Sequence, residues 1–339
     1  MADLDLSLAT ADEAGLSYVS DEAVGITRRR RGKGFSYTMP DGTPLSDPGE
    51  RTRIAALAIP PAWTDVWICP APDGHILATG RDDRGRKQYR YHPEWSRVRS
   101  EDKFGALPAF AASLPRLRER LDADLRRRNL PRQKVLALVV RLLDQTLIRV
   151  GNEAYAAENE SYGLTTMLPD HVDVDGACIA FDFTAKGGLA RNVYVSDTRL
   201  AKVVRQVSEL GGQDLFTYQT EGAIADVTST DVNVYLREVV GEGVTAKHFR
   251  TWGGTVSAAA ALGITRPPES DAQADKAVLA AFDIAAEVLG NTRTVCRESY
   301  VHPAIPDAFR SGLLAELWPR SRATRYLDRR ERLVQRLLA

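Results

Sequence analysis

The sequence has 339 residues, of which 44% are hydrophobic and 27% charged, and its 45 basic and 45 acidic side chains leave no net formal charge. This composition is typical of a globular chain long enough for two domains, and no apolar run approaches the roughly 20 residues that cross a membrane. The acidic start is unlike a secretory signal, and three distant cysteines and five scattered histidines predict neither a disulfide framework nor a metal site. We therefore expect a cytoplasmic protein with no membrane partner, no metal and no cofactor.

The zero net charge hides a strong asymmetry along the chain. Residues 1–26 hold six acidic and no basic side chains, and we interpret them as an acidic leader that is flexible or partly helical. Residues 27–100 hold fourteen basic and eight acidic side chains. Because the local potential matters more than the sum, this segment is compatible with phosphate binding, although charge alone is equally compatible with a solvated surface.

Residues 27–100 are predicted to form a small β-rich domain. The segment begins with the basic run "RRRRGK", and "GFSYTMPDGTPLSD" then alternates aromatic and polar residues around a Pro-Asp-Gly turn, which indicates a hairpin. The pattern returns in "DVWICPAPDGHILATG", and "KQYRYH" is a third candidate strand. One short helix is expected in "DPGERTRIAALAI".

Residues 101–339 are predicted to form a larger, mainly helical domain, with the break between domains near residues 95–105. Helical periodicity covers 104–129 and 132–159, and alternating Ile179, Phe181 and Phe183 then predict a β-hairpin that turns at "AKGG". Further helices are expected at 198–209, 231–240, 245–263, 271–290 and around Tyr300, followed by a basic C-terminal helix pair from residue 311. The expected fold class is α+β.

Six polar residues of this helical domain stand where packing does not require them. They are Arg149 after an apolar helix, Lys186 at the hairpin tip, Lys247 and Arg250 three apart near a helix start, Asn291 at the start of a helix, and Tyr300 nine residues later. Each has an ordinary interpretation: the arginine caps a helix, the hairpin lysine is solvated, and the tyrosine packs in the core.

The order of these residues, within long matching phrases, resembles that of the type IB DNA topoisomerases, particularly the compact poxviral and bacterial enzymes. The resemblance runs from about residue 27 to 318. Its phrases are "GRDDRGRKQYRY", "TLIRVGNEAYAAENESYGLTT", "FDFTAKGG", "DVNVYLREVVGEGVTAKHFRTWGGT" and "CRESYVHPAI". It implies a catalytic domain of the tyrosine recombinase and topoisomerase IB type, which relaxes supercoiled duplex DNA at the nucleoid without ATP or an obligatory metal.

The resemblance also implies a role for each matched residue. Tyr300 would attack the scissile phosphate and form a 3′-phosphotyrosyl intermediate, which the released 5′-hydroxyl can reverse. Arg149 and Arg250 would hold the nonbridging oxygens, and Lys186 would protonate the leaving 5′-oxygen. Because the unperturbed pKa of tyrosine is about 10, Tyr300 would need help from nearby cations or from a proton acceptor.

Two positions depart from the family, and one has a weaker assignment. Asn291 stands where part of the family has a histidine; an amide donates a hydrogen bond but carries no proton, so we assign it hydrogen bonding alone. Ala185 replaces a common glycine before the hairpin lysine, which would stiffen the turn. Lys247 is expected to be a supporting phosphate or proton-relay contact.

The β-rich domain contributes the expected DNA-contacting segment. Gln88 offers an amide for a base edge, and Tyr89 and Tyr91 offer phosphate bonds and apolar surface beside the basic Arg86 and Lys87. The alternative is a plain alternating strand with its tyrosines in the core. The composition break near residue 100 suggests the further hypothesis that a monomer closes around the duplex as a clamp.

Two other functions remain open from the sequence. A tyrosine site-specific recombinase shares the Arg, Lys, Arg and Tyr chemistry, but typically has His-x-x-Arg where this chain has Lys247 and Arg250. A non-enzymatic duplex-binding protein on the same fold is the second, and the complete residue set argues against it.

Overall fold

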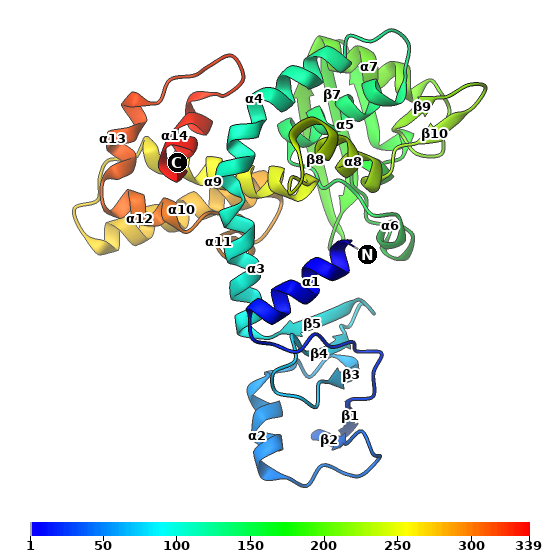
Figure 1. The fold of residues 1–339 in the computed structure, drawn as a ribbon, viewed down its shortest axis with the longest axis vertical. Coiled ribbons are helices and arrows are strands. Elements are labelled where there is room, and N and C mark those ends of the chain that lie inside the picture. The colour runs from blue at the N-terminus through cyan, green and yellow to red at the C-terminus, as the bar shows by residue number, and fades with distance from the viewer. Residues whose placement is uncertain (1) are drawn as a thin grey trace. The chain divides into compact units, whose positions relative to one another are not determined.

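The computed structural model describes residues 2–339, with side chains from Ser7 onward. It divides into two compact units that meet between Lys103 and Phe104, and Figure 1 follows the chain from its blue N-terminal to its red C-terminal end. No helix within the described residues is long and apolar enough to cross a membrane.

The N-terminal unit is built on a five-stranded antiparallel sheet in the order β2-β1-β3-β4-β5. Its strands are β1 (Ile26–Arg31), β2 (Gly34–Thr38), β3 (Thr64–Ile68), β4 (Ile76–Arg81) and β5 (Lys87–Tyr91). Its helices are α1 (Ala2–Glu13), α2 (Pro48–Ala56) and most of α3 (Pro93–Gly105). The strand pair around Asp73 and Gly74, the strand in "KQYRYH" and the short helix all occur as predicted, α2 starting from an Asp47 cap with proline in its first turn.

The basic run at residues 28–31 forms a strand inside the sheet, which the sequence analysis missed. Arg28 in β1 is buried, donates hydrogen bonds to the carbonyls of Pro60 and Trp63, and lies over the ring of Phe35. Four consecutive arginines lack the alternation of polar and apolar residues that normally marks a strand. Burial of Arg28 becomes favourable only in the folded unit, where backbone carbonyls accept its hydrogen bonds.

The acidic leader is helical at its start and bonded to the sheet at its end. After α1, the ring of Tyr18 stacks on His75 with centroids 4.2 Å apart. Asp21 forms an ion pair of 2.6 Å with Lys87 of β5. These contacts lie within the N-terminal unit and hold an acidic residue against one of its basic strands.

The C-terminal unit combines a three-stranded sheet with many helices. The sheet has the order β6-β7-β8, with β6 (Val172–Asp175), β7 (Cys178–Ala185) and β8 (Leu189–Ser196), and β7 and β8 form the predicted hairpin. A small strand pair that was not predicted is formed by β9 (Thr217–Gln219) and β10 (Ile224–Asp226). Two short 3-10 helices span Leu164–Thr166 and Pro169–His171.

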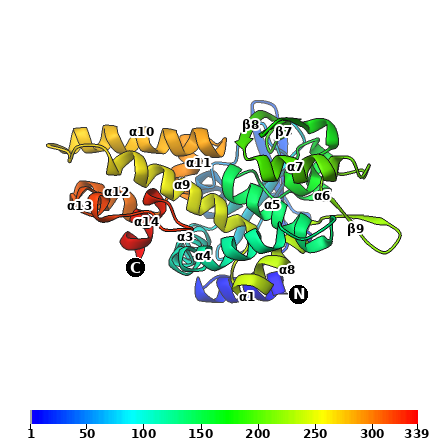
Figure 2. The ribbon, with the colours of Figure 1, turned by 90° about the horizontal axis from the view of Figure 1, so that it is seen from above.

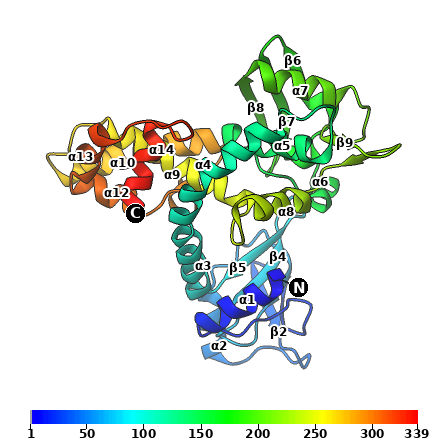
Figure 3. The same cartoon turned by 45° about the horizontal axis from the view of Figure 1, so that its top comes forward.

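The helices of this unit fall into two groups. Those that precede α9 in the chain are α4 (Leu107–Asp124), α5 (Arg132–Thr146), α6 (Glu153–Asn159), α7 (Thr198–Ser208) and α8 (Ser229–Val240). The others are α9 (Ala246–Gly263), α10 (Asp271–Leu289), α11 (Arg293–Ser299), α12 (Ala304–Arg310), α13 (Leu313–Arg320) and α14 (Arg329–Leu338). Helices α5 and α7 contact each other and the sheet (Figure 3), and α9 and α10 run side by side (Figure 2).

The core of the C-terminal unit is continuous across both groups. Helix α5 is buried along most of its length, and every residue from Leu136 to Val140 is fully buried, which explains the continuous apolar run in its middle. The same core includes residues of the hairpin, α9, α10 and α14. The hairpin and the helix ends that approach it are therefore held by packing in one unit.

Candidate active site

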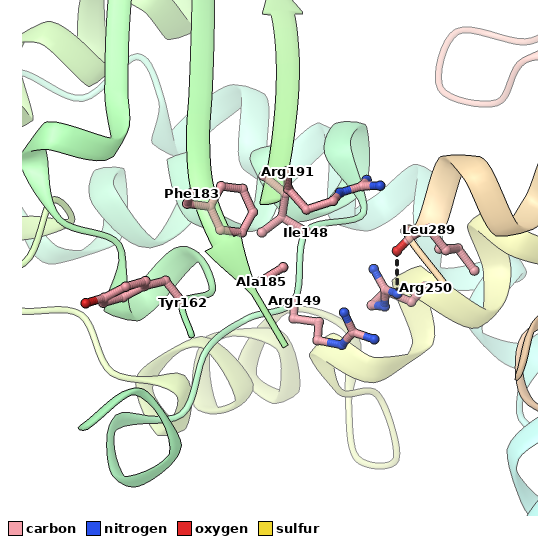
Figure 4. A pocket seen from close by; sticks show the side chains of 9 residues that line it. Ile148, Arg149, Tyr162, Phe183, Ala185, Arg191, Arg250 and Leu289 are labelled. Carbon is pink, nitrogen blue, oxygen red and sulfur yellow. Dashed lines mark hydrogen bonds between the residues drawn. The ribbon is translucent and has the colours of Figure 1, made fainter. Parts of the chain in front are cut away.

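A pocket in the C-terminal unit brings together residues from six separate segments, counting β7 and β8 as two (Figure 4). Its lining is Ile148, Arg149, Tyr162, Phe183, Ala185, Arg191, Arg250, Leu289 and Gly290. Three of these described residues are arginines, each from a different segment, and none is acidic. The pocket therefore concentrates positive charge without a carboxylate to balance it.

Arg149 is placed by the way α5 ends. Leu147 takes a left-handed conformation with φ of 55°, which stops the helix and redirects the chain. Its carbonyl accepts a hydrogen bond from Arg250, and two residues later the Arg149 Nη2 donates to Asn291 Oδ1 at 2.9 Å. The apolar helix thus ends in an arginine that reaches across to the segment after α10.

Arg250 lines the pocket and is only 6% exposed. Besides the Leu147 carbonyl, its Nη2 donates to the carbonyl of Leu289 at 2.9 Å, whereas its Nε has no partner among the described residues. Burial first, and then the charge of Arg149, lower the pKa of Arg250 to about 10, so the guanidinium stays protonated at neutral pH. A buried cation without a carboxylate partner can still bind an anion.

Gly253 and Gly254, which follow Arg250 in α9, allow this helix to lie close to Leu147 and Tyr300. A Cβ on Gly253 would lie 2.3 Å from the Leu147 side chain, and one on Gly254 would lie 2.8 Å from the carbonyl oxygen of Tyr300. Contacts this short are not tolerated by real side chains, so the Gly-Gly pair is needed for α9 to touch both segments. Thr255 completes the contact, since its Oγ1 accepts a hydrogen bond from His302 N at 3.1 Å.

Tyr300 follows the last residue of α11 and is half-buried next to Arg250. The guanidinium carbon lies 5.1 Å from the centroid of the tyrosine ring. Burial by itself raises the pKa of Tyr300, but the charges and hydrogen bonds of Arg250 and Arg149 outweigh it, and the net pKa is lowered. The phenol therefore ionises more readily than an ordinary tyrosine.

Asn291 completes the arrangement from the turn after α10. Gly290 caps that helix in the left-handed region with φ of 60°, and Asn291 follows with its Oδ1 occupied by Arg149. Its Nδ2 is buried and has no hydrogen-bond partner among the described residues. The amide therefore has a buried donor without a partner, next to Arg149.

Two of the predicted residues do not lie with this group. Lys186 is exposed at the hairpin tip, and its Nζ lies 5.3 Å from the ring centroid of Tyr155 in α6, although the preceding Ala185 lines the pocket. Lys247 is exposed on the first turn of α9, whereas Arg250 is buried.

Arg191 is a pocket residue that the sequence analysis missed. It lies in β8 opposite Phe183, on the face of the strand that also carries Val193 and Val195. Charged residues seldom occupy a core-facing position of an alternating strand. The arginine at such a position was therefore the feature of the sequence that could have identified Arg191 as a candidate site residue.

The predicted DNA-contacting segment lies in the N-terminal unit as β5, an edge strand of the sheet. Tyr89 and Tyr91 stack on each other with centroids 5.7 Å apart and are 42% and 44% exposed, so the alternative that they belong to the core is wrong. Lys87 lies over the Tyr89 ring and pairs with Asp21.

Two further residues of this segment share one acidic partner. Arg86 pairs with Asp82 at 2.7 Å, and Gln88 Nε2 donates to the same carboxylate at 2.9 Å. These bonds fix the turn between β4 and β5 and leave the stacked tyrosines exposed beside it.

The chain is similar to known DNA topoisomerases over most of its length. Residues 92–309 match the family model described as the catalytic core of eukaryotic DNA topoisomerase I, and residues 34–82 match that of the N-terminal domain of bacterial DNA topoisomerase IB. DNA topoisomerase 1B of Acanthamoeba polyphaga mimivirus is 32% identical over 288 residues, covering 82% of this chain and 85% of the viral protein. DNA topoisomerase 1 of Daucus carota is 26% identical over 130 residues, which are 37% of this chain and 15% of the plant protein.

Proposed function

Since this chain belongs to the type IB DNA topoisomerases, we propose that Tyr300 is its nucleophile and that the arginine pocket beside it binds the scissile phosphate. The enzyme is an isomerase that relaxes supercoiled duplex DNA by transient cleavage of one strand, rotation and religation. This assignment favours a topoisomerase over the recombinase and the non-enzymatic DNA-binding protein.

The observation that carries the site assignment is the charge balance around Tyr300. Arg149, Arg191 and Arg250 line the pocket without a carboxylate among its described lining residues, and Tyr300 has a lowered pKa next to them. Such an excess of cations is costly unless an anion binds. A phosphodiester fits this requirement, because the guanidinium groups of Arg149 and Arg250 match its nonbridging oxygens and stabilise the charge that develops in the transition state, while Arg191 adds positive charge nearby.

The proposed cleavage step exchanges one phosphoester bond for another. The phenol oxygen of Tyr300 loses its proton to solvent and bonds to phosphorus, while the bond from phosphorus to the 5′-oxygen breaks. The electron pair of that bond goes to the 5′-oxygen, which takes a proton from the ammonium of Lys186. Religation is the reverse reaction, and no ATP is needed because the phosphotyrosyl ester conserves the bond energy.

Lys186 must leave Tyr155 to act as this acid. Its contact with the aromatic ring is exposed, and such cation–π contacts contribute only about 0.5–1 kcal/mol. Gly187 and Gly188 follow it with φ of 90° and 74°, so the tip has residues suited to a change of backbone conformation. We expect DNA binding to draw the lysine toward the leaving oxygen.

Asn291 and Lys247 take secondary roles in this proposal. The unpartnered Nδ2 of Asn291 donates to a nonbridging oxygen of the scissile phosphate, and the exposed Lys247 contacts a phosphate farther along the backbone. Asn291 moves no proton, so acid catalysis depends on Lys186.

For the DNA interface, we propose that β5 contacts the duplex through Tyr89 and Tyr91, with Arg86, Lys87 and Gln88 beside them. One monomer would engage the duplex through both units as a clamp, acting at the nucleoid in the cytoplasm. The exposure of the two tyrosines and the positive charge of residues 27–100 support this interface.

A plasmid relaxation assay with a Tyr300→Phe variant tests the nucleophile. Catalytic amounts of the wild-type protein should relax supercoiled plasmid without ATP or Mg²⁺, whereas the variant should show no relaxation and retain salt-sensitive duplex binding. Tyr194→Phe is a matched control, since it alters an exposed tyrosine of the same unit outside the pocket and should relax plasmid. Relaxation by Tyr300→Phe, or a covalent 3′ adduct trapped with it, would overturn the assignment.

A further inference from the structure

Arg191 joins the β-hairpin to the end of a helix distant in sequence. From β8, its Nη1 donates to the carbonyl of Glu287 at 3.2 Å and its Nη2 to that of Val288 at 3.1 Å. Arg250 takes the next carbonyl, that of Leu289, so two arginines bind the last three carbonyls of α10. Figure 4 shows Arg191 extending from the strand toward the end of α10 that carries Leu289.

This contact has a steric counterpart in the turn that follows α10. A Cβ on Gly290 would lie 2.4 Å from Arg191 Nη1. Glycine suits this position both because of its φ of 60° and because a side chain here would displace the guanidinium. A cation at a helix C-terminus is also favoured by the helix dipole. The position of Arg191 is therefore determined by several groups at once.

The contact lies where the hairpin tip begins. On β7, the carbonyl of Thr184 accepts a hydrogen bond from Tyr162 N at 2.8 Å, and on β8 Arg191 makes its two bonds to α10. The segment 185–190 extends past these two anchors and carries Lys186. At the other side of the contact, the end of α10 leads through Gly290 directly to Asn291.

We propose that Arg191 is a positioning residue that holds the hairpin carrying the acid Lys186 in register with the helix end that carries the phosphate contact Asn291. This inference rests on the proposed role of Lys186. Without the two carbonyl bonds, the tip starts from a variable position and Lys186 reaches the 5′-oxygen in fewer complexes. Arg191 thereby acts through Lys186 on protonation of the leaving group.

A plain helix-capping role leads to a different result. If Arg191 only stabilised the end of α10, its loss would lower the stability of the unit and disturb Asn291 and Arg250 together. Cleavage would then fall by the same factor whatever leaving group the substrate carried. If Arg191 instead bound the phosphate directly, cleavage would again fall without regard to the leaving group.

Two DNA substrates that differ in one atom separate these roles. One carries the ordinary 5′-oxygen at the scissile phosphate and the other a bridging 5′-sulfur, which leaves as a thiolate and needs no proton. Single-turnover cleavage rates of both give a sulfur-to-oxygen rate ratio for each variant. The variants are Arg191→Ala, Lys186→Ala, Arg250→Ala and, as a matched control, Arg199→Ala, which removes an exposed arginine of α7.

For Arg191→Ala we expect cleavage of the oxygen substrate to fall by about 10- to 100-fold, a part of the roughly 10²–10⁴-fold that a general acid contributes. Its cleavage of the sulfur substrate should fall several-fold less than its cleavage of the oxygen substrate. The sulfur-to-oxygen rate ratio should therefore rise above that of the wild type, as we expect for Lys186→Ala. Arg250→Ala should be slow with both substrates, and Arg199→Ala should match the wild type. An equal loss of rate on both substrates, or no loss on either, would overturn the proposal for Arg191.

Two further variants keep the test valid if Arg191→Ala folds poorly. Arg191→Lys retains the positive charge, but a single ammonium group cannot reproduce the two hydrogen bonds of the guanidinium. We therefore expect a sulfur-to-oxygen rate ratio between those of the wild type and Arg191→Ala. Gly290→Asn keeps Arg191, tolerates positive φ and places a Cβ where the guanidinium lies, so its ratio should also rise. A wild-type ratio in both of these folded variants would contradict the proposal.

The outcomes for Lys186 and Arg191 can be told apart. If Lys186→Ala is not rescued by the sulfur substrate, the proposed acid is wrong. If Lys186→Ala is rescued and the Arg191 variants are not, the acid stands and only the positioning role of Arg191 fails.

Discussion

Arg149 donates a 2.9 Å hydrogen bond to Asn291, across 142 positions of the chain. The bond occupies the amide oxygen of Asn291, and the Nδ2 of the same amide is buried without a hydrogen-bond partner among the described residues. An arginine that follows one helix thereby orients an amide that follows another. Both residues keep N–H groups that this bond does not use, and such donors suit a phosphoryl oxygen.

Substitution of Asn291 should slow cleavage according to the donor that is lost. Asn291→Ala removes one transition-state hydrogen bond, and we expect a loss of about 10²–10³-fold, typical of a single oxyanion donor. Asn291→Asp should be slower still, because a carboxylate can pair with Arg149 but repels the phosphate. Single-turnover cleavage of a labelled duplex measures both rates. Wild-type rates in the two variants would show that the amide does not contact the phosphate.

The pH dependence of cleavage should depend on Arg149. Because the phenolate of Tyr300 is the attacking form, the rate should rise with pH through the pKa of Tyr300, which Arg250 and Arg149 lower. Removing the positive charge in Arg149→Ala raises that pKa, so the rise should move to higher pH. The 5′-sulfur substrate is used for the measurement, because the protonation of Lys186 then does not shape the profile. A profile that stays in place, or moves to lower pH, would contradict the coupling.

Alanine at Gly254 should affect both stability and activity. The added Cβ would meet the carbonyl oxygen of Tyr300 at 2.8 Å, so α9 or the nucleophile segment must shift. We expect the free energy of unfolding to fall by about 1–3 kcal/mol, as for other overpacked interiors, and relaxation to slow. Urea unfolding and plasmid relaxation measure the two effects. Ser257→Ala, which changes a part-buried serine of the same helix without adding volume, is the control.

The acidic leader should weaken DNA binding through Asp21. This carboxylate pairs with Lys87 at 2.6 Å, and the partner holds the pKa of Asp21 below its ordinary value although burial opposes this. In Asp21→Ala the lysine becomes available to a phosphate, so duplex affinity should rise and the salt slope should steepen by up to about 1. Titrations at several salt concentrations measure both. Asp12→Ala, an exposed acid of α1, should bind as the wild type does, and unchanged binding in Asp21→Ala would place Lys87 outside the interface.

Short-range signals account for most of what could be predicted. The turns at Asp73-Gly74 and at Gly187-Gly188, the Asp47 cap of α2 and the Gly290 cap of α10 act over a few residues, so the sequence shows the elements they bound. The family phrases likewise identified Arg149, Arg250 and Tyr300, and the structure brings these three together at one pocket or next to it.

The parts that could not be predicted depend on distant segments. Arg28 is buried in β1 because carbonyls some thirty residues away accept its hydrogen bonds, and nothing in "RRRR" indicates them. Arg191 enters the pocket because the end of α10 lies next to the hairpin. Lys186 lies over Tyr155 because α6, which carries that tyrosine, also lies next to the hairpin. Turns, helix caps and most strands follow from the local chain, since backbone geometry and capping act within one or two turns. The neighbours of a charged side chain follow only from tertiary packing, which determines the carbonyls, rings and cations that it meets.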